Sequence, residues 1–539
     1  MDNIKITHLP VVGKNLIEIL MFSMYSDSLI IYREYVQNAY DAIVEASKNG
    51  VLSNIKEGQV SITIDSSKRQ VKILDNGIGI AASMAQQVLL NIADSHKDGI
   101  GLAGQYGIGR LVGAKYCKRL IFKTSAKGES KYTKIIFDNE LAHRIISDKN
   151  DRSTATQVIE RITSVVIGDE EPDKHYFEVQ MEDVSERHRD LLNVSKVTEY
   201  LKEVAPIDYM LEFKNMLYNP SIPMEYKDLT NDLAHIKLTI NDEIDIRKRY
   251  GLIIEGTGDS IDSLQFFKIE DSEFGLLGWG WYAITPFSKQ IPAFDVNRGI
   301  RLRKRNIQIG TKKLLNEYFK EPRGNDFFYG EIHATHQNLR PNSSRDGLTH
   351  TPEAIRLYEY IKSYFADLHN LYHFANEVKN ISRDIHLIGN STSQTEDEKK
   401  DIGKKISTSL EKLSKAKVKY YDDDNISAAS KKILSIYSEN IKQTIDALPS
   451  DILSDINVGK EEIYTPIPSK NISNIVESSS KISTGQEVAD IFEPLVKKYK
   501  PEEIKLIRKV FAILSLNCPV RQRQMFENMK VKANKQLCR

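Results

Sequence analysis

The spacing of apolar residues predicts a first region that mixes helices with strands. Around residues 32–43, apolar positions recur every three to four residues, which predicts a helix with one apolar side. Residues 60–64 and 71–74 alternate apolar and polar positions around the polar turn 66–69, which predicts a β-hairpin. The apolar positions of the helix are Tyr32, Val36, Ala39 and Ile43.

A second region is dominated by strand patterns. It follows the proline-containing segment 219–223, which we interpret as a linker. Apolar and basic residues alternate over 299–310, so we expect a half-buried strand with one cationic face. A helix is expected at 311–319. Further strands are predicted at 236–240, 252–255, 275–284 and 328–333.

The last third of the chain is predicted to be mostly helical. A Thr-Pro-Glu sequence at Thr351 is typical of a helix start, and helical spacing continues to residue 378. Apolar stripes at 402–413 and 433–445 predict two more helices, which fit either a hairpin within one chain or a dimerising coiled coil. A linker at 466–486, helices at 486–499 and 501–516, and a basic tail follow.

Together these elements predict an α/β protein of several domains. The 539 residues are enough for about two to four of them. The predicted domains are a first α/β domain over 1–215, a second βαβ-type domain over 235–350, a helical region over 351–465 that is a candidate for dimerisation, and a small helical module over 486–539.

Composition and charge indicate a soluble chain without a strong electrostatic preference. It is 40% apolar and 28% charged with a net charge of +1, so overall charge favours neither nucleic acid nor a membrane. Three scattered cysteines, Cys117, Cys518 and Cys538, fit a reducing compartment. We recognise no signal peptide and no apolar run of membrane length, so we expect a cytoplasmic protein.

The first candidate chemistry lies on the polar side of the first predicted helix. Glu34, Asn38 and Asp41 are four and three residues apart and therefore share one face. A carboxylate at Glu34 can deprotonate water, and an amide oxygen at Asn38 suits a magnesium ion that also binds phosphate oxygens. Taken alone, these residues fit a solvated helix face better than a site.

The second and third candidate segments are rich in glycine. Asp75 ends a predicted strand, where its carboxylate can accept a hydrogen bond from the amine of adenine, and Gly77 and Gly79 allow the backbone to approach a planar base. Gly104, Gly107 and Gly109 precede a predicted apolar helix at 111–116, whose first amides form an anion site. Residues 94–106 have the composition of a flap that closes over a nucleotide.

In this order and spacing, the three segments resemble the GHKL ATPase superfamily, which includes heat-shock-protein-90 chaperones, gyrase-type topoisomerases, histidine kinases and MutL-type proteins. The resemblance implies a Bergerat-type α/β sandwich that binds ATP and Mg²⁺. It makes Glu34 the general base, Asn38 the magnesium ligand and Asp75 the adenine reader, with Asp41 supporting the pocket wall. A water-activating Glu34 argues against a histidine kinase.

A fourth family element is a threonine that follows a strand. The segment 153–159 fits this element and would place Thr156 on the adenine side, although Ala155 replaces the usual glycine.

The second region resembles the middle domain of heat-shock-protein-90 chaperones. That domain has a loop of the form Leu-Pro-Leu-Asn-x-Ser-Arg-Glu, whose arginine reaches the γ-phosphate. Residues 339–346 match it at Asn342, Ser344 and Arg345, so the resemblance implies that Arg345 senses phosphate. Arg340 is a second candidate, and Lys304 is the candidate if a lysine acts as in MutL-type proteins.

These observations predict an ATP-hydrolysing, nucleotide-gated conformational machine that resembles heat-shock-protein-90 chaperones. We expect a homodimer whose first domains close on ATP and which acts on a protein client or partner, without a membrane. Two other functions remain open at this stage. One is a DNA-engaging clamp of the MutL or MORC kind, with genome defence as a candidate role, and the other is a noncatalytic ATP-binding scaffold.

Overall fold

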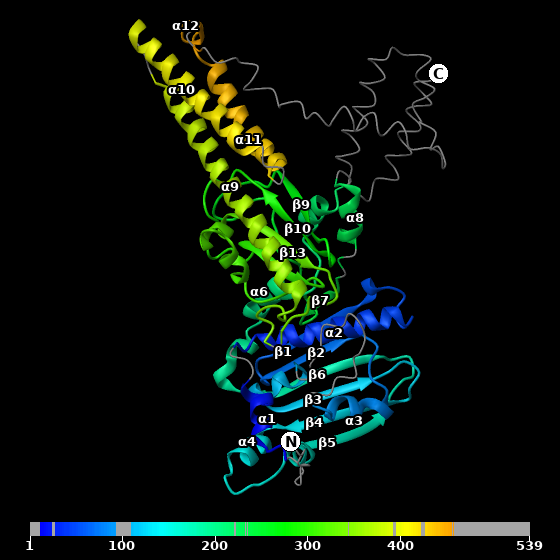
Figure 1. Ribbon diagram of the computed structural model, residues 1–539. Helices are drawn as coiled ribbons and strands as arrows, with labels where there is room; N and C mark the ends of the chain where they lie inside the picture. Colours follow the sequence, from blue (N-terminus) through cyan, green and yellow to red (C-terminus); the bar gives the residue numbers. More distant parts are fainter. Residues whose placement is uncertain are drawn as a thin grey trace, which may run out of the picture. The chain divides into compact units, whose positions relative to one another are not determined.

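The structure is a computed structural model of the chain (Figure 1). It describes residues 11–23, 27–92, 109–219, 222–231, 233, 235–342, 344–391, 395–421, 426–454 and 456. These residues belong to one compact unit, Met1–Tyr464, and a second unit comprises Thr465–Arg539. The predicted linker at 466–486, the helices beyond it and the basic tail lie outside the described residues.

Alternating apolar residues in the first region build a mixed sheet of eight strands, in the order β5-β4-β3-β6-β2-β1-β7-β8. The predicted hairpin is confirmed, because β1 and β2 pair antiparallel from Val60 opposite Asp75 to Asp65 opposite Gln70. The strands are β1 (Gln59–Asp65), β2 (Gln70–Asp75), β3 (Cys117–Ser125), β4 (Lys131–Asp138), β5 (Thr163–Asp169), β6 (Tyr176–Val184), β7 (Lys237–Ile240) and β8 (Ile244–Asp245).

Helix α2 provides the largest helical contribution to the core of this sheet. Its predicted apolar positions, such as Val36 and Ile43, are buried among side chains from β1, β2 and β3. The α-helices of this region are α1 (Asn15–Glu18), α2 (Ile30–Lys48), α3 (Ala82–Leu90), α4 (Asn139–Ser147), α5 (Ala155–Ile162), α6 (Val194–Val204), α7 (Leu211–Leu217) and α8 (Met224–Asn231). Shorter helical turns are η1 (Ile19–Ser23), η2 (Ile55–Glu57), η3 (Gly109–Tyr116) and η4 (Glu186–Leu192).

Two strand predictions in the second region need correction. The strand predicted at 236–240 forms as β7, but it pairs in parallel with β1 and thus completes the first sheet. The strand predicted at 252–255 is wrong, since this segment makes a single bridge between Ile253 and Ser260. The segment is a loop in which Ile254 packs into the core and Ile253 is exposed.

The second region forms its own five-stranded sheet, in the order β12-β11-β13-β10-β9. Strands β11 and β13 run parallel, as in the expected βαβ-type unit, but residues 305–328 between them contain no α-helix. The helix predicted at 311–319 is replaced by two 3₁₀ turns, the second beginning at Pro322. The elements are β9 (Ser263–Asp271), β10 (Gly275–Ile284), β11 (Gly299–Lys304), β12 (Ile307–Gln308), η5 (Leu314–Tyr318), η6 (Pro322–Phe327) and β13 (Tyr329–Ala334).

The predicted cationic face of the strand at 299–310 is buried, which corrects the sequence analysis. Arg301 and Arg303 are 2% and 1% exposed. Arg301 Nη1 lies 3.0 Å from Glu203 Oε1, and Arg303 Nε lies 2.7 Å from Glu331 Oε1. A guanidinium group can be buried when such carboxylates neutralise it, and these partners are too distant in sequence for a local pattern to reveal.

The helical region packs within one chain, as one of the two interpretations predicted. Thr351 caps α9 by accepting a hydrogen bond from the Ala354 amide, which confirms the predicted helix start. The apolar stripe of α10, including Ile406 and Leu410, is buried in one cluster with residues of α9 and α11. The helices are α9 (Pro352–Gly389), α10 (Glu396–Tyr421), α11 (Ser427–Asp446) and α12 (Ser450–Ser454). Among the described residues, none of the helices has the length and apolarity that a membrane span requires.

Candidate functional site

The candidate site is built on α2, whose polar side is buried rather than solvated. Glu34 is 1% exposed and Asp41 is fully buried, whereas Asn38 is partly exposed. Burying two carboxylates is costly unless cations or hydrogen-bond donors compensate them. The solvated-face interpretation is therefore wrong for Glu34 and Asp41, and their environment must contain compensating groups.

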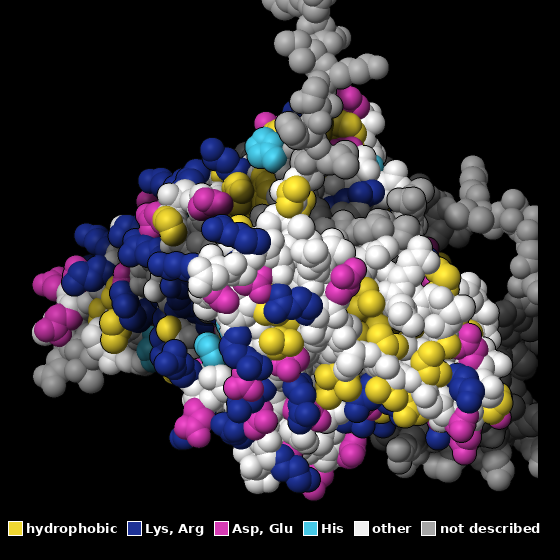
Figure 2. All heavy atoms as spheres, turned by 90° about the horizontal axis from the view of Figure 1, so that it is seen from below, with side chains coloured by type: hydrophobic (Ala, Val, Ile, Leu, Met, Phe, Trp, Pro, Cys, Tyr) yellow, Lys and Arg dark blue, Asp and Glu magenta, His cyan; other side chains and the backbone are white. Residues whose placement is uncertain are grey.

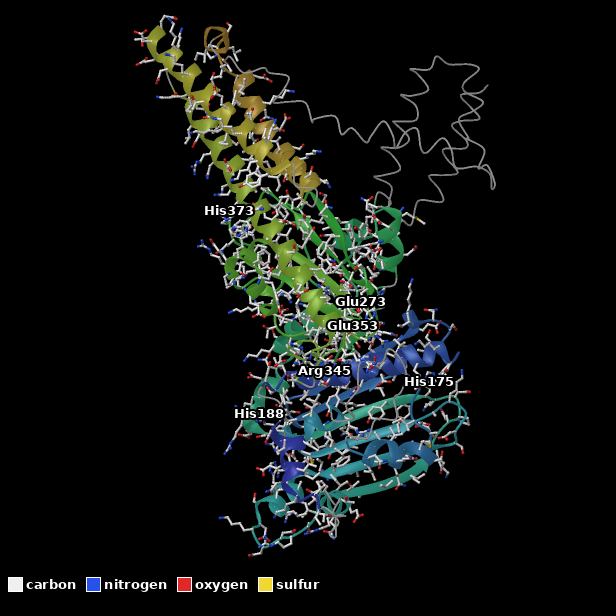
Figure 3. The ribbon with its side chains drawn as sticks, in the orientation of Figure 1. His175, His188, Glu273, Arg345, Glu353 and His373 are labelled. Atoms are coloured by element: carbon white, nitrogen blue, oxygen red, sulfur yellow. The ribbon has the colours of Figure 1, made fainter. Side chains whose placement is uncertain are left out.

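Arg345 compensates Glu34 from a loop that follows the second sheet (Figure 3). Its Nε lies 2.6 Å from Glu34 Oε1, and its Nη1 donates a hydrogen bond to Gln37 Oε1. Arg33 lies on the same carboxylate with its Nε 3.7 Å from Glu34 Oε1. The structure thus brings together Glu34 and Arg345, which are more than 300 residues apart in the sequence.

The backbone holds Arg345 in an unusual conformation. Its φ is 55°, in the left-handed region that non-glycine residues seldom adopt and that costs on the order of 1 kcal/mol or more. The Arg345 amide donates to Asn342 O at 3.1 Å, and the Arg345 carbonyl accepts from the Gly310 amide at 2.8 Å. These bonds fix the backbone from which the Arg345 side chain extends to Glu34.

The surroundings of Glu34 fit a water and a magnesium–phosphate group. Glu34 Oε2 is buried and has no hydrogen-bond partner among the described residues. At the start of η3, a Cβ added to Gly109 would lie 2.8 Å from this oxygen, so glycine keeps the space beside it open. Asn38, one helical turn along α2, adds the amide oxygen that suits a hard cation.

Asp75 ends β2 as a second buried carboxylate. It is 4% exposed, and its Oδ1 accepts a hydrogen bond from the Gly77 amide at 2.8 Å. Burial raises the pKa of Asp75 to about 7, although the hydrogen bonds from the Gly77 and Phe177 amides oppose that rise. A buried acceptor at a strand end has the chemistry expected of a group that recognises an exocyclic amine.

Gly77 and Gly79 both occupy positions that require glycine. A Cβ on Gly77 would lie 2.6 Å from Ala42 Cβ on α2. Gly79 has a φ of 69°, and a Cβ there would overlap the backbone of Ser125 on β3. The requirement comes from packing of the turn against α2 and β3, and contact with a planar base stays a prediction.

The predicted position of Thr156 after a strand is wrong. Thr156 lies in the first turn of α5 and is exposed. Thr154 and Gln157 form a capping box that starts this helix, a signature that the sequence analysis overlooked. The strand beside Asp75 is β6, where Phe177 pairs with Asp75.

Two residues beside Asp75 were missed by sequence reasoning. His175, just before β6, has its Nδ1 2.8 Å from Gly77 O (Figure 3). Thr124 on β3 is fully buried; its Oγ1 accepts from the Ile80 amide at 2.9 Å and donates to Tyr176 O at 2.9 Å. The alternating strand pattern at 176–184, which follows a proline-containing turn, is a signal for the position of His175, whereas no local signal singles out Thr124.

The remaining candidates have a mixed outcome. Gly104, Gly107 and the whole of the expected flap at 94–106 lie outside the described residues. Lys304 donates to His336 O at 2.7 Å and to Thr335 O at 3.2 Å, and burial lowers its pKa to about 8. Lys304, Gln37 and Arg345 line one small pocket between α2 and the second sheet.

Comparisons with known proteins identify the class of this site. Residues 29–167 match the family described as "Histidine kinase-, DNA gyrase B-, and HSP90-like ATPase". That stretch contains Glu34, Asn38, Asp41 and Asp75. The first region therefore contains a GHKL-type ATPase domain.

Similar proteins define the kind of GHKL domain more closely. The chain is 34% identical over 112 residues to "Chaperone protein HtpG" of Nitrobacter winogradskyi, covering 17% of the chain and 18% of that protein. It is 26% identical over 197 residues to the protein of the same name from Natranaerobius thermophilus, covering 33% and 31%. For that of Fusobacterium nucleatum, identity is 22% over 254 residues, covering 43% and 41%. The domain is thus Hsp90-like, while the chain matches less than half the length of these relatives.

Substitution of Asp75 tests its predicted role through opposite effects on binding and stability. An acid whose pKa is raised by folding costs stability as pH rises from about 4 to about 7. We expect Asp75→Asn to raise the free energy of unfolding by roughly 2 to 4 kcal/mol at pH 8, with little effect near pH 4. The same variant should lose ATP binding, measured by calorimetry.

A surface carboxylate serves as the control for this experiment. Asp242→Asn is expected to change neither property, because Asp242 lies in an exposed turn where its Oδ1 accepts from Ser61. Unchanged ATP affinity in Asp75→Asn would show that Asp75 does not contribute a hydrogen bond to adenine.

Proposed function

We propose that this chain is a magnesium-dependent ATPase that works as a nucleotide-gated conformational machine. The observation that carries the proposal is the contact between Arg345 and Glu34, because it joins a water-activating carboxylate to a phosphate-sensing arginine from another sheet. Each group alone has ordinary structural uses. Together, in a GHKL-type domain, they have the charges that phosphoryl transfer to water requires.

The residues divide the reaction between them. Glu34 accepts a proton from the attacking water, and Arg345 neutralises charge on the γ-phosphate oxygens as the bond to ADP breaks. Asp75 accepts a hydrogen bond from the adenine amine. Asn38 would hold a magnesium ion, which when bound would supply positive charge to the phosphate oxygens. The products are ADP and phosphate.

The position of Arg345 also supports gating by the nucleotide. Arg345 belongs to a loop after β13, whereas Glu34 belongs to α2, which packs against the first sheet. A γ-phosphate that draws Arg345 away from Glu34 changes the contact between the two regions, so binding energy is converted into movement. We propose that this movement drives closure of a homodimer on a protein client or partner, as expected for a chaperone-like protein.

The direct test is ATP hydrolysis by the full chain with and without magnesium. We expect steady phosphate release in Mg²⁺ and loss of nearly all turnover in excess EDTA, measured by a coupled phosphate assay. Phosphate release that continues unchanged in EDTA would contradict the proposal.

A DNA-engaging clamp remains a second candidate because of the lysines on α10. Residues 402–420 contain six lysines and one glutamate. Lys404, Lys412 and Lys415 are exposed and share one face of the helix, here called the α10 lysine face. Figure 2 shows Lys and Arg side chains gathered at its left. Such a face suits phosphate backbones.

The same hydrolysis assay separates the two candidates when duplex DNA is added. The chaperone-like function predicts unchanged turnover. DNA-stimulated turnover that falls with rising salt, and that Lys404→Glu, Lys412→Glu and Lys415→Glu together abolish, would favour the clamp.

A further inference from the structure

The turn between β11 and β12 has a backbone that is unusual for its residues. Arg305 and Asn306 have φ values of 52° and 64°, while Lys304 and Ile307 on either side pair with each other. A two-residue turn with both φ values positive favours Asn and Gly. Arginine at the first position is therefore disfavoured locally, and contacts elsewhere must hold it there.

One of those contacts reaches the candidate ATP site. Arg305 Nη1 lies 3.6 Å from Asp41 Oδ1. Asp41 is fully buried on α2, two helical turns from Glu34, and Arg305 is 24% exposed. Because an uncompensated buried carboxylate is costly, this guanidinium influences the stability and orientation of Asp41.

The second position of the turn is anchored in a buried group of charges. Asn306 Oδ1 accepts a hydrogen bond from Lys248 Nζ, and Asn306 O accepts from Arg303 Nη1 at 3.1 Å. Lys248 Nζ and Arg303 Nε lie 3.0 Å and 2.7 Å from the oxygens of Glu331. We call this group the Glu331 cluster; its members are Lys248, Arg303, Glu331, His333, Tyr209 and Tyr250.

Electrostatics make the Glu331 cluster sensitive to displacement. Burial alone would raise the pKa of Glu331, but Arg303 and Lys248 hold it well below its usual range. Burial lowers the pKa of Lys248 to about 7. In a site of low dielectric, small changes in these distances have large energies, so displacement of the turn changes the energy of the cluster.

The Glu331 cluster also contacts both tryptophans of the chain. His333 Nε2 lies 3.2 Å from Glu331 Oε2, and Trp279 stacks on His333 with ring centroids 4.6 Å apart. Trp281 lies 5.2 Å from Tyr250, whose hydroxyl donates to Glu331 Oε1 at 3.1 Å. Indole fluorescence therefore reports on this cluster.

The same turn is linked to Arg345 and to the core of the first region. Ile307, directly after the turn, is buried in the cluster that contains residues of α2 and β1. Gly310, at the end of this segment, donates its amide to Arg345 O at 2.8 Å. A movement of α2 that displaces the turn thus also shifts the backbone that positions Arg345.

We propose that Arg305 is a positioning residue that couples nucleotide binding on α2 to the placement of Arg345 and to the Glu331 cluster. Asp41 and Arg305 form the link on the α2 side, and Asn306 and Gly310 carry its effect into the second sheet. The inference rests on the proposed ATP hydrolysis. It adds that the second sheet senses the nucleotide through the turn at 304–307 as well as through Arg345.

The test compares Arg305→Ala, Arg305→Lys and Arg247→Ala in the full chain, using Mg²⁺–ATP as the probe. Arg247 is the matched control, since it is 45% exposed and its Nε pairs with Asp245. In wild type and Arg247→Ala we expect ATP to change the tryptophan emission. In Arg305→Ala we expect that change to disappear, with kcat at least tenfold lower and KM within threefold of wild type.

Arg305→Lys keeps the charge. It is expected to recover part of the wild-type kcat and part of the ATP-dependent change in tryptophan emission, which a purely structural role would not predict. Wild-type kcat and emission in Arg305→Ala would overturn the inference, and so would a loss of kcat that leaves the ATP-dependent emission intact. A kcat loss with a large rise in KM and a lowered melting temperature would assign Arg305 a structural role. If wild type binds ATP without hydrolysing it, the proposed function fails, and the emission change in Arg305→Ala still decides the inference.

Discussion

Glu34→Ala is expected to lower ATP turnover by about 10²- to 10⁴-fold while ATP still binds. Glu34 is buried on α2 with one oxygen held by Arg345 and the other without a partner among the described residues, so it is placed to accept a proton from water. Because the contact proposed for adenine lies at Asp75, loss of the Glu34 carboxylate removes the general base and leaves the proposed adenine contact in place. Single-turnover hydrolysis and calorimetric ATP binding measure the two effects separately.

Glu34→Gln is the matched variant for this experiment, because it keeps the shape of the side chain and removes its basicity. We expect Glu34→Gln to be as inactive as Glu34→Ala. We expect its melting temperature to be higher than that of Glu34→Ala, since a polar partner for Arg345 remains. Turnover in Glu34→Gln at the wild-type rate would contradict the assignment of Glu34 as the base. ATP binding without any Glu34-dependent turnover would leave the noncatalytic scaffold as the better account.

Arg345→Ala is expected to lower kcat by about 10³-fold or more, since an arginine that stabilises transferring phosphoryl oxygens contributes 10³ to 10⁵ in rate. The affinity for ADP should change little, because ADP lacks the γ-phosphate. The variant also removes the nearer of the two cations that compensate buried Glu34, so we expect a lower melting temperature in the absence of nucleotide. Chemical quench and ADP titration measure these effects.

Arg340→Ala is the control for the same loop. Arg340 is exposed, whereas Arg345 is 12% exposed and lies on Glu34. We expect Arg340→Ala to keep most of the wild-type kcat. A loss confined to Arg340→Ala, with Arg345→Ala active, would move the phosphate-sensing role to Arg340. A loss confined to Lys304→Ala would instead favour a lysine of the MutL type.

Local periodicity was sufficient to predict the elements whose neighbours are close in sequence. The β1–β2 hairpin, β10 and the start of α9 depend on alternation, turn residues and a capping threonine, and all three are confirmed. The order of the three site motifs predicted the GHKL-type domain for the same reason, since each motif is a local segment. The roles of the individual site residues stay predictions.

Elements that depend on distant partners were predicted poorly. β7 joins the first sheet because β1 offers a free edge, which no pattern within residues 236–240 reveals. Arg301 and Arg303 are buried because Glu203 and Glu331 neutralise them from distant segments. The error at Thr156 has a different cause. The capping box formed by Thr154 and Gln157 was visible in the sequence, but the segment was interpreted as the end of a strand.

The central claim is that Glu34 from the first region and Arg345 from the second act on the same reaction. The most direct test is a double-mutant cycle on single-turnover hydrolysis with Glu34→Ala, Arg345→Ala and the double variant. Two residues that act on one transition state are strongly non-additive, so removing the second costs little once the first is gone. The account predicts wild-type turnover, two nearly inactive single variants that bind ATP, and a double variant no slower than the slower single variant. Independent, multiplicative losses would contradict it, as would a wild type that binds ATP and releases no phosphate.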